Sequence, residues 1–290
     1  MKFCKGLICG LLWLVAWPCF SDMPEPNQIT ISVLDFRGEE EALQRWLPLA
    51  KKIENTLGVR VDLSALRHKQ QVKLASESHI IISNPIVTSE ISAQLPDYRV
   101  IATLNSPSQG PRFGGNILVS EESEIRTLEQ LKGRVIGVVN QQSSAGGFVF
   151  QAYELIQLGW SPLNEYVELV SLHNQYAILE RLEKGQIDAG FVRNNILDET
   201  EDFEASKFRM LMRQDYACTA ATTPLYPHWG VTVSNRLSKQ QQQKLQTMLL
   251  QLTADNIAAR RANILGFIAP LDYTQVHALL EKVLPHKHHY

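Results

Sequence analysis

The chain has 290 residues, of which 44% are hydrophobic and 20% are charged. This length and composition suit one large domain or two ordinary domains with a packed core, and they exclude wholesale disorder. Lys and Arg number 28 against 30 for Asp and Glu, which gives a formal net charge of −2. The chain lacks the basic excess that neutralises phosphates along a duplex, so we expect no nucleic-acid partner.

The first residues have the pattern of a secretory signal peptide. Lys2 and Lys5 precede an apolar run at 6–17, which is shorter than the roughly 20 residues needed to span a bilayer. Cleavage is predicted after Ser21, so that residues 1–21 form the signal peptide and the mature protein lies in the periplasm. An uncleaved anchor is the alternative.

Short β-rich runs alternate with helical patterns along the rest of the chain. Strands are predicted at 29–34, 59–63, 79–83, 99–104, 116–119, 135–139, 167–172, 189–192, 208–211 and 230–233. Helices are predicted at 39–57, 127–131, 148–158, 175–184, 239–261 and 274–283, with one more short helix between the second and third strands. This alternation predicts an α/β fold of parallel sheets with helices on both faces.

The predicted strands indicate two lobes rather than one sheet. About ten strands are many for a single open sheet, and turn residues gather at 106–115 and again at 220–227. We expect the chain to cross between lobes near Phe113 and near Thr222. The predicted boundaries are 22–115 with 225–290 for the first lobe and 116–224 for the second.

Motifs of catalysis are missing from the sequence. There is no nucleophile elbow, zinc-binding helix motif, phosphate-binding loop or dinucleotide-binding glycine pattern. Cys218, the one cysteine beyond the signal peptide, is expected to be a small buried residue rather than a nucleophile. The histidines at 286–289 are expected to belong to a frayed terminus rather than to a metal site. We therefore expect no enzymatic activity, no metal and no cofactor.

The segment 140–147 (NQQSSAGG) is the sharpest local signal. It follows a predicted buried strand and opens a predicted helix, so its backbone N–H groups would lie at the positive end of that helix. With Ser143, Ser144, Gly146 and Gly147, such a turn can bind an anion. Ordinary capping of the helix by one of the two serines explains the same pattern equally well.

Polar side chains follow several other predicted strands. Arg37 and Arg193 each come at the carboxyl end of a strand, where open α/β sheets bind ligands, and the planar fork of Arg suits oxyanions. Asn84 also follows a strand, where it could contact a ligand or cap the next helix. Tyr226 in the second turn-rich segment could close over a ligand or simply pack.

Eight segments along the chain carry a resemblance to a known family. They are 33–38 (VLDFRG), 46–50 (WLPLA), 83–85 (SNP), 114–119 (GGNILV), 128–138 (LEQLKGRVIGV), 144–148 (SAGGF), 185–193 (GQIDAGFVR) and 223–229 (TPLYPHW). Together they resemble the phosphate/phosphonate-type periplasmic solute-binding proteins of the PhnD-like group. Within that group, the sequence is more similar to the periplasmic sensor region of tetrathionate-sensing histidine kinases.

The resemblance implies the type II periplasmic-binding-protein fold, with two α/β lobes hinged over a ligand cleft. It implies ligand contacts from the loops that hold Arg37, Asn84, the 143–147 turn and Arg193. Many relatives carry an aromatic residue where this chain has Thr88, so the ligand of those relatives does not transfer to this chain. The kinase region of the sensors is absent, so any signalling is expected to pass through a separate protein.

These observations predict an exported solute-binding protein that captures a small anionic ligand, an oxyanion, between its lobes. Its expected partner is the permease of an ABC importer or a membrane histidine kinase, and the protein itself is expected to be a monomer. Two alternatives stay open. One is a sensor or adaptor that binds no ligand and acts through a protein partner, and the other is an enzyme on the same fold.

Overall fold

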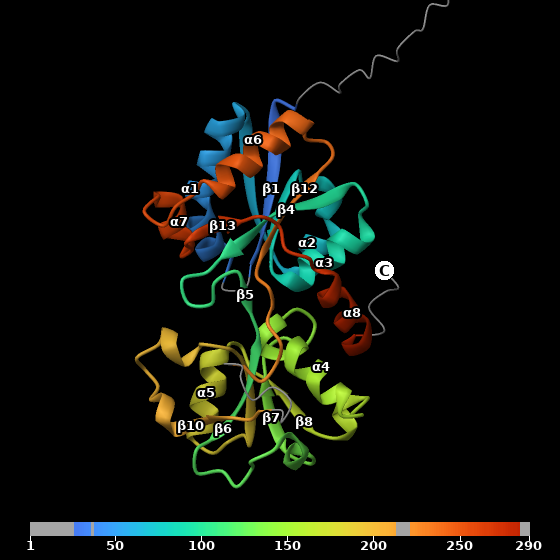
Figure 1. Cartoon of the computed structure of the whole chain (residues 1–290), viewed down its shortest axis with the longest axis vertical. Coiled ribbons are helices and arrows are strands. Elements are labelled where there is room, and N and C mark those ends of the chain that lie inside the picture. The colour runs from blue at the N-terminus through green and yellow to red at the C-terminus, as the bar shows by residue number, and fades with distance from the viewer. Residues whose placement is uncertain (1–25, 36–37, 213–220, 285–290) are drawn as a thin grey trace, which may run out of the picture.

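The computed structural model describes residues 26–35, 38–212 and 221–284, which form two α/β lobes joined by a narrow ribbon (Figure 1). The predicted signal peptide, Arg37, Cys218 and the C-terminal histidines lie outside the described residues. No helix in the described ranges is long and apolar enough to cross a membrane. The two-lobed α/β fold class predicted from the sequence is confirmed.

Lobe 1 is built on a six-stranded sheet with the order β13-β4-β12-β3-β1-β2. Its strands are β1 (Gln28–Leu34), β2 (Arg60–Leu66), β3 (Ile80–Ser83), β4 (Tyr98–Asn105), β12 (Gly230–Ser234) and β13 (Gly266–Ile268). Its helices are α1 (Glu39–Leu57), α2 (His68–Lys73), α3 (Pro85–Gln94), α6 (Lys239–Leu250) and α7 (Ile257–Ala262). The strands come from both ends of the described chain, as Figure 1 shows by the blue and orange ribbons of the upper lobe.

The strands of lobe 1 bury side chains on both faces. Ile80 and Ile82 of β3 pack into the cluster that contains residues of α1, α6 and α7, while Ile81 between them packs into a second cluster with Val87 and Ile91 of α3. Successive side chains of a strand point to opposite faces, so a continuous apolar run is required where helices cover both. This explains why the run HIIIS reads as a fully buried strand.

Lobe 2 is built on a five-stranded sheet with the order β10-β6-β9-β7-β8. Its strands are β6 (Gly115–Ser120), β7 (Val135–Val138), β8 (Glu168–Ser171), β9 (Ala189–Arg193) and β10 (Phe208–Met210). Its α-helices are α4 (Phe150–Gln157) and α5 (Gln175–Glu183). Phe191 of β9 packs in the same cluster as α4, and its neighbour Val192 packs with α5, so the two helices lie on opposite faces of the sheet.

The prediction of parallel sheets is only partly correct, because both sheets are mixed. In lobe 1, β12 runs antiparallel to β3 and β4, and β13 runs antiparallel to β4. In lobe 2, β6 runs antiparallel to β9 and to β10. β6 and β12 are the first strands after each crossing, and they enter their sheets without the helical crossover that keeps neighbours parallel. β13 follows β12 through α6 and α7 and, like β12, runs antiparallel to β4.

The single helix predicted at 239–261 is wrong, because the structure has two helices there. α6 ends at Leu250, and α7 begins after Asn256, whose side chain accepts a hydrogen bond from the backbone N–H of Ala258 at 3.0 Å. Asn is a strong N-cap and a poor residue for a helix interior. The apolar spacing continued across this break, which is why periodicity alone did not reveal it.

Two short strands and one helix connect the lobes. β5 (Arg112–Phe113) pairs antiparallel with β11 (Tyr226–Pro227), so the two crossings lie side by side as a ribbon. Helix α8 (Thr274–Val283) contacts both α3 and α4, and Figure 1 shows it between the lobes. Its buried Val276, Leu279 and Leu280 belong to the same apolar cluster as Phe150 of α4. The predicted boundaries assign α8 to lobe 1, and the structure shows that it packs on lobe 2 as well.

Candidate functional site

The carboxyl ends of parallel strands in the two lobes meet at the ribbon. β6 begins at Gly115, which pairs with Arg193 at the end of β9, and β12 begins at Gly230, which pairs with Ser83 at the end of β3. Because β5 leads into β6 and β11 leads into β12, both crossings enter their sheets at these edges. Open α/β sheets bind ligands at such edges. We call the region between them the interlobe junction.

The 140–147 turn lies at this edge of lobe 2. It leads into a π-helical turn, Ala145–Val149, that continues as α4. The backbone N–H of Ser144 donates to the carbonyl of Asn140 at 3.0 Å, and the N–H of Val139 donates to the carbonyl of Gly147 at 3.0 Å. The Ser144 side chain precedes the helical turn but makes no capping hydrogen bond to it. The capping alternative is therefore not supported for Ser144, and anion binding by this turn stays a prediction.

Asn84 has one of the two roles that its position left open, the helix cap, and contact with a ligand stays a prediction. It caps α3, because its Oδ1 accepts a hydrogen bond from the N–H of Val87 at 3.1 Å. Its Nδ2 donates to the backbone carbonyl of Ser143 at 2.8 Å. A lobe 1 side chain thus contacts the lobe 2 turn directly, and Asn84 and Ser143 lie together at the interlobe junction.

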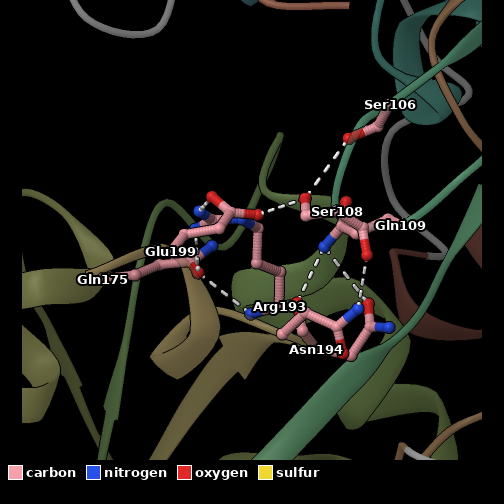
Figure 2. Close-up of polar contacts among 8 residues, drawn as sticks. Ser106, Ser108, Gln109, Gln175, Arg193, Asn194 and Glu199 are labelled. Carbon is pink, nitrogen blue, oxygen red and sulfur yellow. Dashed lines mark hydrogen bonds and ion pairs between the residues drawn. The ribbon is translucent and has the colours of Figure 1, made fainter. Parts of the chain in front are cut away.

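Arg193 lies against the same turn. A methyl group added at Gly146 would come within 3.0 Å of the Arg193 Cβ and 3.1 Å of the Phe113 ring, so the absence of a side chain at Gly146 permits this close approach. The Arg193 backbone N–H donates to Oε1 of Gln175 at 2.9 Å, and its guanidinium pairs with Glu199. Figure 2 shows Gln175 and Glu199 beside the Arg193 side chain.

Tyr226 packs in the ribbon behind these residues. Its side chain is buried, and its ring lies 4.4 Å from the ring of Phe150, centroid to centroid. This geometry favours the packing role over closure upon a ligand. Of the predicted site residues in the described ranges, Asn84, Arg193 and the 143–147 turn are brought together, and Tyr226 supports them from the apolar cluster.

Sequence reasoning missed His228, which lies in the ribbon just before β12. Burial, together with the positive charges of Arg45 and Arg193, lowers the pKa of the His228 imidazole to about 3. Its Nδ1 accepts a hydrogen bond from the N–H of Trp229 at 2.8 Å, so the neutral ring carries its proton on Nε2. The ring also packs on Phe113 at a centroid distance of 4.9 Å. The rule that singled out Arg193 considered polar residues that follow a predicted strand, and it passed over His228 because this residue precedes β12.

Arg45 is the second missed residue. It lies on α1 of lobe 1, its Nε donates to the carbonyl of Ala262 at 2.9 Å, and its guanidinium lies 5.3 Å from the ring centroid of Trp46. Trp46 in turn stacks on Trp229 at 6.1 Å. Nothing in the sequence separates Arg45 from the other charged residues of α1, because its role depends on the packing of that helix. Arg45 and Arg193 thus bring positive charge to His228 from opposite lobes.

Acidification should destabilise the protein through His228. The folded state binds the His228 proton only near pH 3, whereas an imidazole in the unfolded chain has its usual pKa of 6.5. The contribution of neutral His228 to stability is therefore complete above pH 6.5, the imidazole pKa in the unfolded chain, and is lost as the pH falls below that value. Between about pH 6.5 and about pH 5.5, we expect this residue to remove about 1 kcal/mol of unfolding free energy. Urea unfolding of the wild type and of His228→Gln at both pH values measures it.

His79 needs a control in that experiment, because burial and Arg236 also lower the pKa of its imidazole. Both proteins retain His79, so its contribution cancels in the difference between them. The expected result is a smaller loss of stability in His228→Gln than in the wild type. Equal losses in the two proteins would show that His228 stays solvated and takes up its proton normally when the protein is folded.

The sequence of the chain matches the profile of a known protein family. The profile of the family described as "ABC transporter, phosphonate, periplasmic substrate-binding protein" matches residues 31–274, which is most of the chain. The chain belongs to this family. The match includes both lobes, the ribbon and all the junction residues described above. Among the described residues, no group of three or more His, Cys, Asp or Glu side chains is placed to hold a metal ion.

One curated relative of the chain is a sensor kinase. The tetrathionate sensor histidine kinase TtrS of Salmonella typhimurium is 24% identical over 296 residues, which cover 97% of this chain and 46% of the kinase. The chain therefore spans about half the length of this curated relative. Its matched region confirms the resemblance inferred from the sequence.

Solved structures show the same fold. XAC2383 from Xanthomonas citri, bound to chloride ion, is 17% identical with a TM-score of 0.75, and the match covers 90% of this chain and 100% of that one. PhnD1 from Prochlorococcus marinus, in complex with methylphosphonate, is 15% identical with a TM-score of 0.69 over 89% of this chain and 99% of the other. At these identities, the likeness establishes the two-lobed architecture of the family.

Proposed function

We propose that the protein is an exported solute-binding protein that captures a small oxyanion at the interlobe junction. The observation that carries this proposal is the position of Arg193 at the carboxyl end of β9, against Gly146 of the 140–147 turn, which Asn84 of lobe 1 also contacts. Besides burial, the positive charges of Arg45 and Arg193 both lower the pKa of His228, which indicates a positive potential that a bound anion would reduce. The family of periplasmic binding proteins and the 140–147 turn support the same conclusion.

An anion at this place would bind the closed protein best. In the closed form it would receive charge-assisted hydrogen bonds from Arg193 and the 140–147 turn of lobe 2 and from the lobe 1 side of the junction. In an open form it would keep the contacts of only one lobe. A ligand can shift a conformational equilibrium only by its difference in affinity for the two forms. Binding and closure would therefore be coupled, and a partner protein could recognise the closed surface.

The partner is proposed to be an ABC importer permease or a membrane histidine kinase. The family description supports the first and the relative TtrS supports the second. We propose a binding role and no catalysis, with residues 1–21 removed on export to the periplasm. Amino-terminal sequencing of the protein from a periplasmic fraction should find a start near Asp22. An intact amino terminus on cytoplasmic protein would contradict export.

A second candidate function is an adaptor that binds no solute. The hydrogen bond from Asn84 to Ser143 already links lobe 1 to lobe 2 with protein groups alone. A protein whose lobes are held in this way could present a fixed surface to its partner. The adaptor is the favoured function if no solute raises the stability of the protein.

A ligand screen separates the two candidates. The mature protein, unfolded and refolded to remove bound solute, would be heated with phosphate, sulfate, methylphosphonate, thiosulfate and tetrathionate, and with neutral sugars as controls. At 100 times its dissociation constant, a ligand adds about 2.7 kcal/mol to the unfolding free energy. We expect a raised melting temperature with at least one oxyanion and none with the sugars. No shift with any anion would reject oxyanion capture and leave the adaptor.

A further inference from the structure

The guanidinium of Arg193 already holds a carboxylate. Its Nη2 donates to Oε2 of Glu199, which ends the short 3₁₀ turn Leu197–Glu199 after β9. The pair is partly exposed, with 19% of the Arg193 side chain and 29% of the Glu199 side chain accessible to solvent. A carboxylate is itself an oxyanion. Glu199 therefore supplies Arg193 with the same chemical group that the proposed ligand would supply.

Glu199 also receives a hydrogen bond from lobe 1. The hydroxyl of Ser108 donates to Oε1 of Glu199 at 2.6 Å and lies 3.3 Å from the hydroxyl of Ser106. Both serines belong to the turn that follows β4. The two oxygens of one carboxylate are thus held from opposite lobes, as Figure 2 shows. This is the arrangement expected for an anion that holds the lobes closed.

The backbone between Arg193 and Glu199 is fixed by hydrogen bonds to the 106–110 turn. Gln109 Nε2 donates to the carbonyl of Asn194 at 2.7 Å, and Asn195 Nδ2 donates to the carbonyl of Ser108 at 2.7 Å. Asn195 adopts a φ of 59°, a left-handed conformation that Asn tolerates better than most residues. These contacts hold the 106–110 turn against the segment between Arg193 and Glu199. The position of Glu199 follows from a defined local structure rather than from one flexible side chain.

We propose that Glu199 is an internal occupant of the anion site, and that an external oxyanion binds Arg193 by displacing it. The proposal rests on the proposed function, because it assumes that Arg193 is a ligand-binding residue. Nη2 of Arg193 donates to Glu199 and Nη1 donates to Oε1 of Gln175 at 3.5 Å, so the fork formed by these two nitrogens is occupied and a bidentate oxyanion must displace Glu199 from it. The apparent dissociation constant then equals the intrinsic one divided by the fraction of molecules in which Glu199 has moved away.

Such competition has a defined signature. It reduces the affinity for every anion that uses Arg193 by the same factor, because each must displace the same carboxylate. Simple repulsion by a nearby negative charge behaves differently, since it acts about twice as strongly on a dianion as on a monoanion. Comparison of sulfate, a dianion, with methanesulfonate, a monoanion, therefore separates displacement from repulsion.

The test is Glu199→Gln, which keeps the size of the side chain and removes its charge. Isothermal titration of the mature protein with sulfate and with methanesulfonate should show an affinity about 5-fold higher for both anions, which corresponds to the upper range for a partly exposed ion pair. Glu201→Gln is the matched control, because it removes the same charge from an exposed residue two positions away. It should leave both affinities within about 2-fold.

Each result decides between the alternatives. An equal gain for the two anions supports displacement, and a gain confined to sulfate rejects it in favour of repulsion. Unchanged or weaker binding by Glu199→Gln, with a wild type that binds, rejects the internal occupant and leaves the proposed function intact. Failure of both proteins to bind any anion of the panel rejects the proposed function as well. If Glu199→Gln does not fold, Ser108→Ala removes the lobe 1 hydroxyl alone and should give a smaller gain in the same direction.

Discussion

Arg193→Ala is expected to weaken the binding of an oxyanion by about 1.5–3 kcal/mol, or roughly 10- to 150-fold in dissociation constant. The guanidinium lies at the carboxyl end of β9, beside Gly146 of the 140–147 turn. Removal of a charged donor from a largely enclosed position removes a charge-assisted hydrogen bond that water cannot replace fully. The substitution also leaves the carboxylate of Glu199 at the junction without its cation, which opposes an incoming anion further.

Arg134→Ala is the matched control for this prediction. Arg134 precedes β7, so it lies at the amino ends of the parallel strands, opposite the end at which Arg193 lies, and its side chain is 49% exposed. Titration of both variants with the anion found in the ligand screen should show the loss only for Arg193→Ala. Urea unfolding should show that both variants lose less than about 1 kcal/mol, since neither contributes to an apolar core. Equal affinity of Arg193→Ala and the wild type would contradict the proposed site.

The order of elements was predictable because each sheet strand carries its own local pattern. The apolar run at 79–83 and the alternation at 29–34 mark β3 and β1 without any knowledge of their neighbours. Strand direction was not predictable in the same way. In the sheet, β12 lies between β3 and β4, two strands that precede it by more than 120 residues in the chain. Its antiparallel orientation follows from the ribbon through which the chain enters lobe 1. The residues of β12 themselves do not indicate whether the strand runs parallel or antiparallel to its neighbours.

The candidate site was predictable to the extent that it follows strand ends. Arg193, Asn84 and the 140–147 turn all follow strands, and the structure places them together. Arg45 was not predictable, because it reaches the junction from the middle of a helix. Glu199 was missed because its return to Arg193 depends on the turn at Asn195 and on contacts with the 106–110 turn of lobe 1. Pairings of that kind depend on two loops far apart in the sequence.

A second large effect is expected at Gln151, which fixes the backbone under the site. This side chain of α4 is completely buried. Its Nε2 donates to the carbonyls of Val192 at 2.7 Å, Gly146 at 2.9 Å and Asn116 at 3.2 Å. The three carbonyls belong to β9, to the π-helical turn and to β6. One amide group therefore holds the residue before Arg193 and the glycine beside Arg193 in a fixed relation.

Gln151→Met should lower the unfolding free energy by about 2–4 kcal/mol. Methionine preserves most of the length and volume but donates no hydrogen bond, and each buried carbonyl left without a donor costs about 1–3 kcal/mol. Because two N–H hydrogens serve three acceptors in the wild type, the total falls short of three full penalties. Urea unfolding should show a lower midpoint at an unchanged slope. Gln157→Met, an exposed position on the same helix, is the control and should stay within about 0.5 kcal/mol of the wild type.

Gln151→Met should also weaken the binding of the anion, although Gln151 is not itself one of the predicted ligand-binding residues. Without the amide, the Gly146 carbonyl and the end of β9 lose their common donor, so the 140–147 turn and Arg193 keep their spacing less well. Loss of this spacing reduces affinity, because the anion must form hydrogen bonds with the turn and with Arg193 at the same time. Titration under conditions where Gln151→Met is folded should show a lower affinity than Gln157→Met. A variant that keeps wild-type stability and affinity would show that other donors satisfy these carbonyls and that Gln151 does not position the site.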